Sequence, residues 1–310
     1  MHAERRWAAL ILLALAGLAL VPLAVRRDDT LNLIFLILLS VTLAQSWNII
    51  AGYAGQVNLG HAAFFGLGAL VTRTLWIGGT PVLVAMLAGA FVAMVFALAI
   101  GVAAFRLRGA YFAIGTLALG EILRITTGNI FSEISTLPAA TIAAYRLTLR
   151  YYLGLGLAAL AVVVGATLAT SRLGLGITAI REDEDAAEAS GVNALGLKLT
   201  ALAAATVLAA LAGGLFAYYH ISYYPQHPFS PHWTFDALLI TYIGGVGTLH
   251  GPVLGAVFYV LLKEYLANRW VDLHLLIFGV FFIVIVLLLP GGLVEAGERV
   301  RRLLRSRLRR

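Results

Sequence analysis

The sequence contains no cysteine and few charged residues. Among its 310 residues, Asp, Glu, Lys and Arg together make up only 12%. The absence of cysteine excludes disulfide bonds, thiol catalysis and thiolate metal sites. Three catalytic sequence patterns are also missing: the G-x-x-x-x-G-K-[ST] phosphate loop, H-E-x-x-H and G-x-S-x-G. We therefore expect no catalytic site, cofactor or metal in this chain; if ATP drives the protein, another chain hydrolyses it.

Long apolar runs dominate the rest of the sequence. Hydrophobic residues make up 61% of the chain and the mean hydropathy is +0.93, whereas soluble domains have roughly 45–50% apolar and about 25% charged residues. This composition predicts an all-α polytopic integral membrane protein, a single domain over residues 1–310, with about 8–10 transmembrane helices and some broken or re-entrant segments. Apolar runs place candidate spans near residues 7–25, 31–51, 61–77, 81–105, 109–130, 151–170, 198–220, 235–249, 251–267 and 273–290.

The first apolar run fits two kinds of segment. Its basic start, MHAERRW, followed by apolar residues to Val25, has the layout of a signal peptide. The run is nevertheless close to the ~20 residues that cross a hydrocarbon core, and no clear cleavage site precedes Arg26. We expect a retained first helix.

The distribution of basic residues predicts the orientation of the spans, because positive charge is retained on the cytoplasmic side. With the amino terminus inside, the inner side holds 14 Lys and Arg residues and the outer side holds six. Seven of the 14 lie in a basic tail, residues 298–310, directly after an apolar run. The net charge of +7 therefore indicates a cytoplasmic membrane flank rather than a nucleic-acid-binding face. Both termini are predicted to be cytoplasmic.

Two glycine-rich polar stretches interrupt the apolar runs, GYAGQVNLGH at 52–61 and GGVGTLHG at 244–251. Non-helical backbone at membrane depth must be buried in protein or line a wet cavity, and broken helices often mark a transport pathway. The alternative is that the glycines only permit close helix packing. The two stretches share Val, His and Gly at equal offsets, which is weak support for an internal repeat. The candidate pathway residues are Gln56, Asn58, His61 and His250.

Glu121 and Arg124 are candidate pathway residues in another span, 109–130. Their i,i+3 spacing places them on one helix face, where they can pair, and charge at membrane depth is rare without a reason. They could form a polar point on a substrate route or a brace between helices. Alternatively, the span ends near Leu119 and both lie at the outer interface.

Three histidines surround the expected outer loop at 221–233: His220, His227 and His232. Prolines between them stop the regular helix that would align metal ligands. We therefore expect this loop to pack against a soluble partner outside, with no metal site.

The longest charged interior segment is SRLGLGITAIREDEDAAEASGVNALGLK at 171–198, which the charge count places in the cytoplasm. Residues 177–190 are predicted to form a short helix with an Arg181–Asp185 pair, and Gly191 is predicted to supply a left-handed stop. The segment is either a helix that inserts into a groove of a partner or a solvated connector.

Residues 185–191, DAAEASG, resemble the E-A-A-x-x-x-G signature of ABC importer permeases, with Asp185 in place of glutamate and without the downstream I-x-L-P. Four longer blocks resemble, in matching order over roughly residues 30–290, the permease subunits of branched-chain amino-acid ABC transporters, specifically the M-type (LivM-like) subunit. These blocks are AGYAGQVNLGHAAFFGLGA at 51–69, FRLRGAYFAIGTLALGEILR at 105–124, AIREDEDAAEASGVN at 179–193 and GGVGTLHGPVLGA at 244–256.

The resemblance implies a permease that forms half of a translocation path for branched-chain or related hydrophobic amino acids in a bacterial or archaeal plasma (inner) membrane. It would pair with a similar H-type permease, two cytoplasmic ATPase subunits and an extracytoplasmic substrate-binding protein. The 171–198 loop would be the coupling loop that docks in an ATPase cleft. The docking residues would be Arg181, Glu182, Asp183, Glu184, Asp185, Ala186, Ala187 and Gly191.

Two alternatives stay open. Relatives of this family also carry urea and short amides, and the blocks quoted above do not separate those substrates. The broken spans also suit a stand-alone secondary transporter or channel, with Glu121 as a proton site. Recognition of the substrate is expected to reside mostly in the binding protein.

Overall fold

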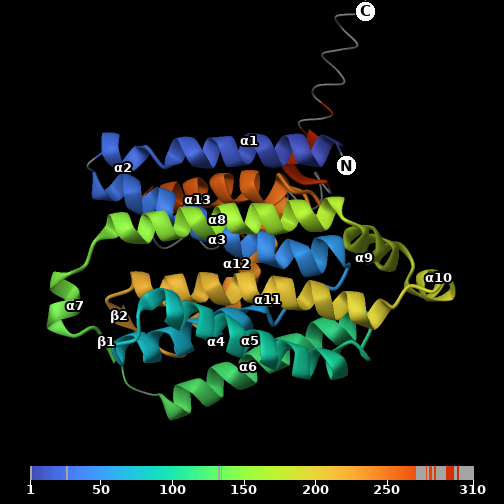
Figure 1. The fold of residues 1–310 in the computed structure, drawn as a ribbon, viewed down its shortest axis with the longest axis horizontal. Helices are drawn as coiled ribbons and strands as arrows, with labels where there is room; N and C mark the ends of the chain where they lie inside the picture. Colours follow the sequence, from blue (N-terminus) through green and yellow to red (C-terminus); the bar gives the residue numbers. More distant parts are fainter. Residues whose placement is uncertain are drawn as a thin grey trace, which may run out of the picture.

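The structure is a computed structural model that describes residues 2–25, 27–131, 133, 135–269, 277, 279–280, 283, 291–296 and 299. Long helices run side by side in a bundle (Figure 1). They are α1 (His2–Leu18), α3 (Asp28–Trp47), α4 (His61–Ile77), α5 (Val82–Ala104), α6 (Ala110–Ile130), α8 (Leu147–Thr170), α11 (Ala194–Tyr219), α12 (Pro231–Gly244) and α13 (Gly251–Arg269), and a short helix, α2 (Val21–Ala24), follows α1.

The helices match the expected spans. Five helical stretches in the described part of the chain are long and apolar enough to cross a membrane: 6–24, 28–53, 82–104, 147–170 and 194–219. The helices α4, α6, α12 and α13 follow four other expected spans, and the last expected span, 273–290, lies almost wholly outside the described residues. The prediction of an all-α polytopic membrane protein is confirmed.

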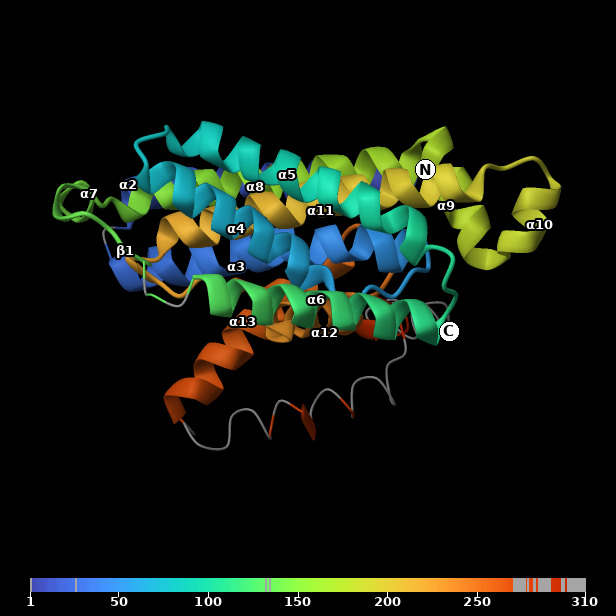
Figure 2. The ribbon, with the colours of Figure 1, turned by 90° about the horizontal axis from the view of Figure 1, so that it is seen from below.

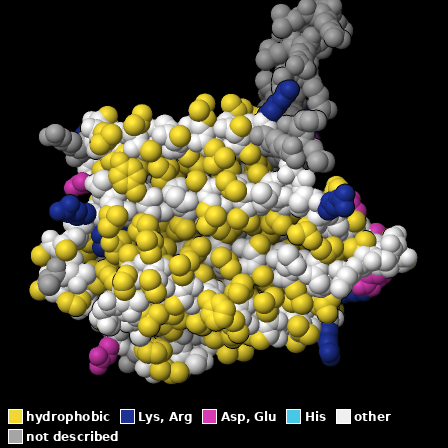
Figure 3. Space-filling model, in the orientation of Figure 1, with side chains coloured by type: hydrophobic (Ala, Val, Ile, Leu, Met, Phe, Trp, Pro, Cys, Tyr) yellow, Lys and Arg dark blue, Asp and Glu magenta, His cyan; other side chains and the backbone are white. Residues whose placement is uncertain are grey.

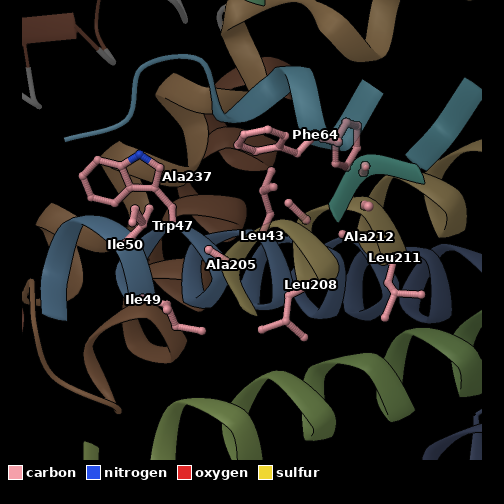
Figure 4. Packing of buried hydrophobic residues seen from close by; sticks show 14 of the residues in the cluster. Leu43, Trp47, Ile49, Ile50, Phe64, Ala205, Leu208, Leu211, Ala212 and Ala237 are labelled. Atoms are coloured by element: carbon pink, nitrogen blue, oxygen red, sulfur yellow. The ribbon is translucent and has the colours of Figure 1, made fainter. Parts of the chain in front are cut away.

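The core of the bundle lies around α11, which packs against α3, α4, α5 and α8. Small side chains allow this close approach: a Cβ atom at Gly213 would lie 1.9 Å from the Phe65 carbonyl oxygen, and one at Gly68 would lie 2.1 Å from that of Ala210. Leu208 and Leu211 of α11 join the main cluster of buried apolar side chains, which includes Trp47 (Figure 4). Glycines outside the two glycine-rich stretches thus allow α4 and α11 to pack closely.

Charged side chains gather at the two ends of the bundle. Figure 3 shows an apolar belt between charged ends on the face drawn. One end carries α7 (Ala139–Ala143) and the antiparallel pair β1 (Ser135–Thr136) and β2 (Ser222–Tyr223). The opposite end carries the start of α1 with α9 (Arg172–Glu182) and α10 (Glu184–Ala189). We call these the α7 end and the α9 end.

We expect tags at residues 140 and 186 to report opposite sides of the membrane, because α7 and α10 lie at opposite ends of the bundle (Figure 2). Labelling by a membrane-impermeant reagent in intact cells checks this topology. Labelling of both positions from the same side would contradict it.

At the α7 end, the buried guanidinium of Arg73 holds two loops together. It donates five hydrogen bonds of 2.7–3.1 Å, to the hydroxyl and carbonyl of Ser135 and to the carbonyls of Ala217, His220 and Ile221. The carbonyls of Ala217 and His220 belong to the last turn and the C-cap of α11, where helical donors are lacking, while Ser135 belongs to β1. Arg73 thus joins the α6–α8 connection to the α11–α12 connection.

Replacing Arg73 with alanine should remove the charged donor that these carbonyls share and lower the free energy of unfolding by about 2–4 kcal/mol. Thermal unfolding in detergent and protease cleavage near residue 135 would measure the loss. Arg146→Ala, which removes an exposed arginine at the same end, is the matched control. Equal stability of the two variants would contradict the role given to Arg73.

Candidate functional site

Both glycine-rich stretches break their helices, as predicted. After α3, the chain forms a π-helical turn, η1 (Asn48–Tyr53), and then a non-helical segment, 54–60, before α4 begins at His61. A π-helical turn inside a helix frequently lies at a functional site. In the second stretch α12 ends at Gly244, and α13 begins at Gly251.

The structure brings the two breaks together, although they are about 200 residues apart in sequence. The Asn48 side chain accepts a hydrogen bond from the Gly247 N–H (2.9 Å) and donates one to the Thr248 carbonyl (3.0 Å). One turn earlier, Gln45 donates to the Leu249 carbonyl (2.5 Å). Side chains of α3 and η1 therefore satisfy the backbone groups that the second break leaves without helical partners. We call this region the break junction.

Among the predicted pathway residues, Asn58 and His61 hold the first break. The Asn58 side chain accepts from the Gly60 N–H (2.8 Å), and its carbonyl accepts from the Trp47 indole (2.9 Å). His61 is fully buried, and its Nε2 lies 2.8 Å from the Ser46 hydroxyl. These contacts give both residues a structural role, and their pathway role stays a prediction.

The other two break residues lie apart from that pair. Gln56 is half-buried, and its amide donates a long hydrogen bond, 3.4 Å, to the Ala54 carbonyl. The His250 ring stacks on that of Trp7, with 4.5 Å between ring centroids. His250 therefore connects the second break to α1.

Arg181 of α9 reaches into the break junction. Its Nη1 donates a hydrogen bond of 2.7 Å to the Gly52 carbonyl in η1. A Cβ atom at Gly247 would lie 2.6 Å from this nitrogen, and one at Gly55 would lie 3.0 Å from Cγ of Arg181. Gly247 and Gly55 also have φ angles of +75° and +69°, which residues with a side chain rarely adopt. The two glycines thus leave room for the arginine.

The segment after α8 differs in two ways from its prediction. It forms two helices, α9 and α10, instead of one over 177–190, because Asp183 is extended and caps the second helix by accepting from the Ala186 N–H (3.0 Å). The predicted Arg181–Asp185 pair is wrong: Arg181 bonds to Gly52, and Asp185 pairs with Arg108 (3.2 Å). The break at Asp183 removes the helical spacing on which that pair depended.

Besides Arg181, three of the predicted docking residues have an inward or structural contact. Glu184 pairs with Lys198 at 2.5 Å, and the Lys198 side chain is only 2% exposed. Ala187 packs with Ile180 and Ala194 in a small apolar cluster. These two contacts hold α10 against α9 and the start of α11, and the Asp183 cap begins α10 itself.

The remaining four predicted docking residues lie on the outer face of α9 and α10. The acidic side chains there are exposed, and Gly191 ends α10 with φ of +87°, as predicted. The Asp185–Arg108 pair is 76% and 63% exposed, so it contributes little stability. Together with Glu188, which was not among the predicted residues but is also exposed, they form a surface that we call the docking face: Glu182, Asp185, Ala186, Glu188 and Gly191.

Glu121 and Arg124 form an ion pair of 2.8 Å within α6. The helix continues past Leu119 to Ile130, so both residues lie within it; their place on a route, in a brace or at the outer interface stays a prediction. The pair joins two residues of one helix and lies midway along it, with 33% and 39% of the side chains exposed. A half-exposed ion pair at this depth is costly in lipid, which favours a wet path or a partner protein against this face.

At the α7 end, the three histidines lie around a cavity of about 470 Å³ with Trp233 and Lys263. Burial lowers the pKa values of His220 and His227 below the usual value, so both are neutral at pH 7. Within the described ranges, no group of His, Asp or Glu side chains could hold a metal ion.

Sequence reasoning missed Gln45, Asn48 and Lys198. Gln45 and Asn48 lie just before the first glycine-rich stretch. Two amide side chains at the end of an apolar run could have indicated a polar contact there. Lys198 was counted only as a cytoplasmic charge, since its burial depends on how α10 folds back onto α11.

Three comparisons with known proteins bear on this chain. The family model described as the permease component of the branched-chain amino acid transport system matches residues 30–286. The "High-affinity branched-chain amino acid transport system permease protein LivM" of Escherichia coli (strain K12) is 27% identical over 319 residues, covering 92% of this chain and 74% of the relative. The "Probable branched-chain amino acid transport permease protein LivM" of Methanocaldococcus jannaschii is 27% identical over 210 residues, covering 61% of each.

No solved structure matches the chain. The family match covers well over half of its length and includes both breaks, α6 and the docking face. The chain belongs to the family of permease components of branched-chain amino acid transport systems.

Proposed function

We propose that this chain is the permease subunit of an ABC importer and forms half of a translocation path for branched-chain or related hydrophobic amino acids. One observation carries the proposal: α9 and α10 present an exposed acidic face at one end of the bundle, while Arg181 on the same unit bonds to the break junction. This arrangement suits a unit that receives force from a partner and transmits it into the membrane.

Energy comes from two cytoplasmic ATPase subunits that dock on the docking face. The lack of a phosphate loop in this chain is consistent with separate ATPases. The α9 end is cytoplasmic, because Arg108, Arg172, Arg181 and Lys198 lie there with the start of α1. Both termini are then cytoplasmic, in the plasma (inner) membrane of a bacterium or archaeon.

A second, H-type permease completes the path, and an extracytoplasmic binding protein delivers the substrate to the α7 end. The partly exposed ion pair on α6 supports a path or partner on that side. Along α6, the buried side chains form a single stripe of Phe112, Thr116, Gly120 and Thr127, so the remaining surface of the helix is available to a partner.

Reconstitution tests the proposal. Proteoliposomes that contain this chain, its H-type partner and both ATPases should take up labelled leucine when the binding protein is outside and ATP is inside. ATPases lacking the phosphate-loop lysine are the control and should give no uptake. Uptake by this chain alone on an ion gradient would instead establish a secondary transporter, and uptake of urea but not leucine would reassign the substrate.

A further inference from the structure

We propose that Arg181 is the positioning residue that fixes α9 to the break junction, so that a displacement of α9 and α10 moves both broken spans. This inference rests on the proposed function. It assigns Arg181 to force transmission rather than to the ATPase contact.

The contact geometry points inward. Nη1 of Arg181 lies 2.7 Å from the Gly52 carbonyl oxygen, and Gly52 lies in the last turn of η1, where carbonyls lack helical donors. A hydrogen bond from a charged donor is roughly twice as strong as a neutral one. The guanidinium is therefore a firm link between α9 and η1.

The link extends from the first break to the second. A Cβ atom at Gly52 would lie 2.8 Å from the Gly247 backbone nitrogen, so the two backbones are in close contact. Asn48, four residues before Gly52, also hydrogen-bonds to Gly247 and Thr248. A movement of η1 is consequently transmitted to the connection between α12 and α13.

Two ion pairs hold α10 in place. The Glu184–Lys198 pair joins α10 to the start of α11, and the Asp185–Arg108 pair lies at the surface. Neither pair touches the break junction. Arg181, in contrast to Glu184 and Asp185, hydrogen-bonds to a broken span.

The first test separates transmission from docking in the assembled importer. Arg181→Gln should lower leucine uptake at least about tenfold, which corresponds to about 1.4 kcal/mol, while the ATPases still co-purify and still hydrolyse ATP. Arg181→Lys should retain part of the uptake, because it keeps a charged donor. Arg172→Gln, on the same helix, exposed and with the same charge loss, is the matched control and should transport normally.

The second test uses the cysteine-free sequence. A Cβ atom at position 55 would lie 3.4 Å from Cβ of Arg181, close to the separation of about 3.5–4.5 Å in disulfides. In the double variant Gly55→Cys, Arg181→Cys, reduced protein should be uncoupled. Oxidation should replace the lost contact with a disulfide and restore uptake. The single variant Gly55→Cys is the control, and oxidation should not change its uptake.

Normal uptake by Arg181→Gln would overturn the inference, and so would a formed disulfide that restores no uptake. Loss of ATPase co-purification in Arg181→Gln would overturn it as well, by making Arg181 a docking residue. If the proposed function itself were wrong, the result would differ, because the wild-type chain would then co-purify with no ATPase.

Discussion

Replacing Asp185 with lysine should reduce uptake by the assembled importer at least about tenfold and leave membrane insertion unchanged. The exposed pair of Asp185 with Arg108 is worth about 0–1 kcal/mol, so stability should change little. Docking should suffer more, because the change reverses a charge between Glu182 and Glu188, and a misplaced charge at an interface costs several kcal/mol. Uptake and ATPase co-purification measure the effect.

Two companion variants sharpen this prediction. Asp28→Lys makes the same change at the first turn of α3, at the α7 end, and should transport normally. Gly191→Trp should act like Asp185→Lys: a Cβ atom at Gly191 meets nothing within 4 Å, so the fold tolerates the bulk, while the docking face does not. Its φ of +87° adds a strain of about 1–2 kcal/mol. Normal uptake by both Asp185→Lys and Gly191→Trp would exclude the docking face.

Replacing Glu121 with glutamine should lower uptake at least about tenfold, because it leaves the Arg124 charge unpaired midway along α6. Breaking a buried pair costs 3–5 kcal/mol, and partial exposure reduces the expected loss of stability here to about 1–2 kcal/mol. Leucine uptake and thermal unfolding in detergent measure the two effects separately.

A double variant distinguishes a pathway from a structural pair. Glu121→Gln combined with Arg124→Gln removes both charges, so thermal stability should return close to that of the wild type. Uptake should stay low if the polar face of α6 lines the path. Wild-type uptake by the double variant would show that the pair has no part in transport.

The sequence patterns predicted the fold class and the two breaks well. Apolar runs of span length define helices such as α5 and α11 regardless of their neighbours, and GYAGQVNLGH cannot continue a helix easily. The left-handed conformation of Gly191 was also predictable, since glycine commonly ends a helix in this way.

Contacts between distant segments could not be predicted in the same way. The meeting of Asn48 with Gly247 depends on the packing of α3 against α12 and α13, which no local pattern encodes. The inward direction of Arg181 was missed for a related reason. An i,i+4 pair with Asp185 is the expected local contact, but the extended conformation of Asp183 separates α9 from α10.

Site-specific cross-linking tests the central claim most directly. Glu188 is exposed on α10, and in this cysteine-free chain Glu188→Cys supplies a unique thiol for a short photo-activated cross-linker. The account predicts a cross-linked product with the ATPase subunit whose yield changes when ATP is added, and none from Thr148→Cys at the α7 end. The account would be contradicted if the ATPase cross-linked to position 148, or if position 188 gave no product in an importer that transports leucine.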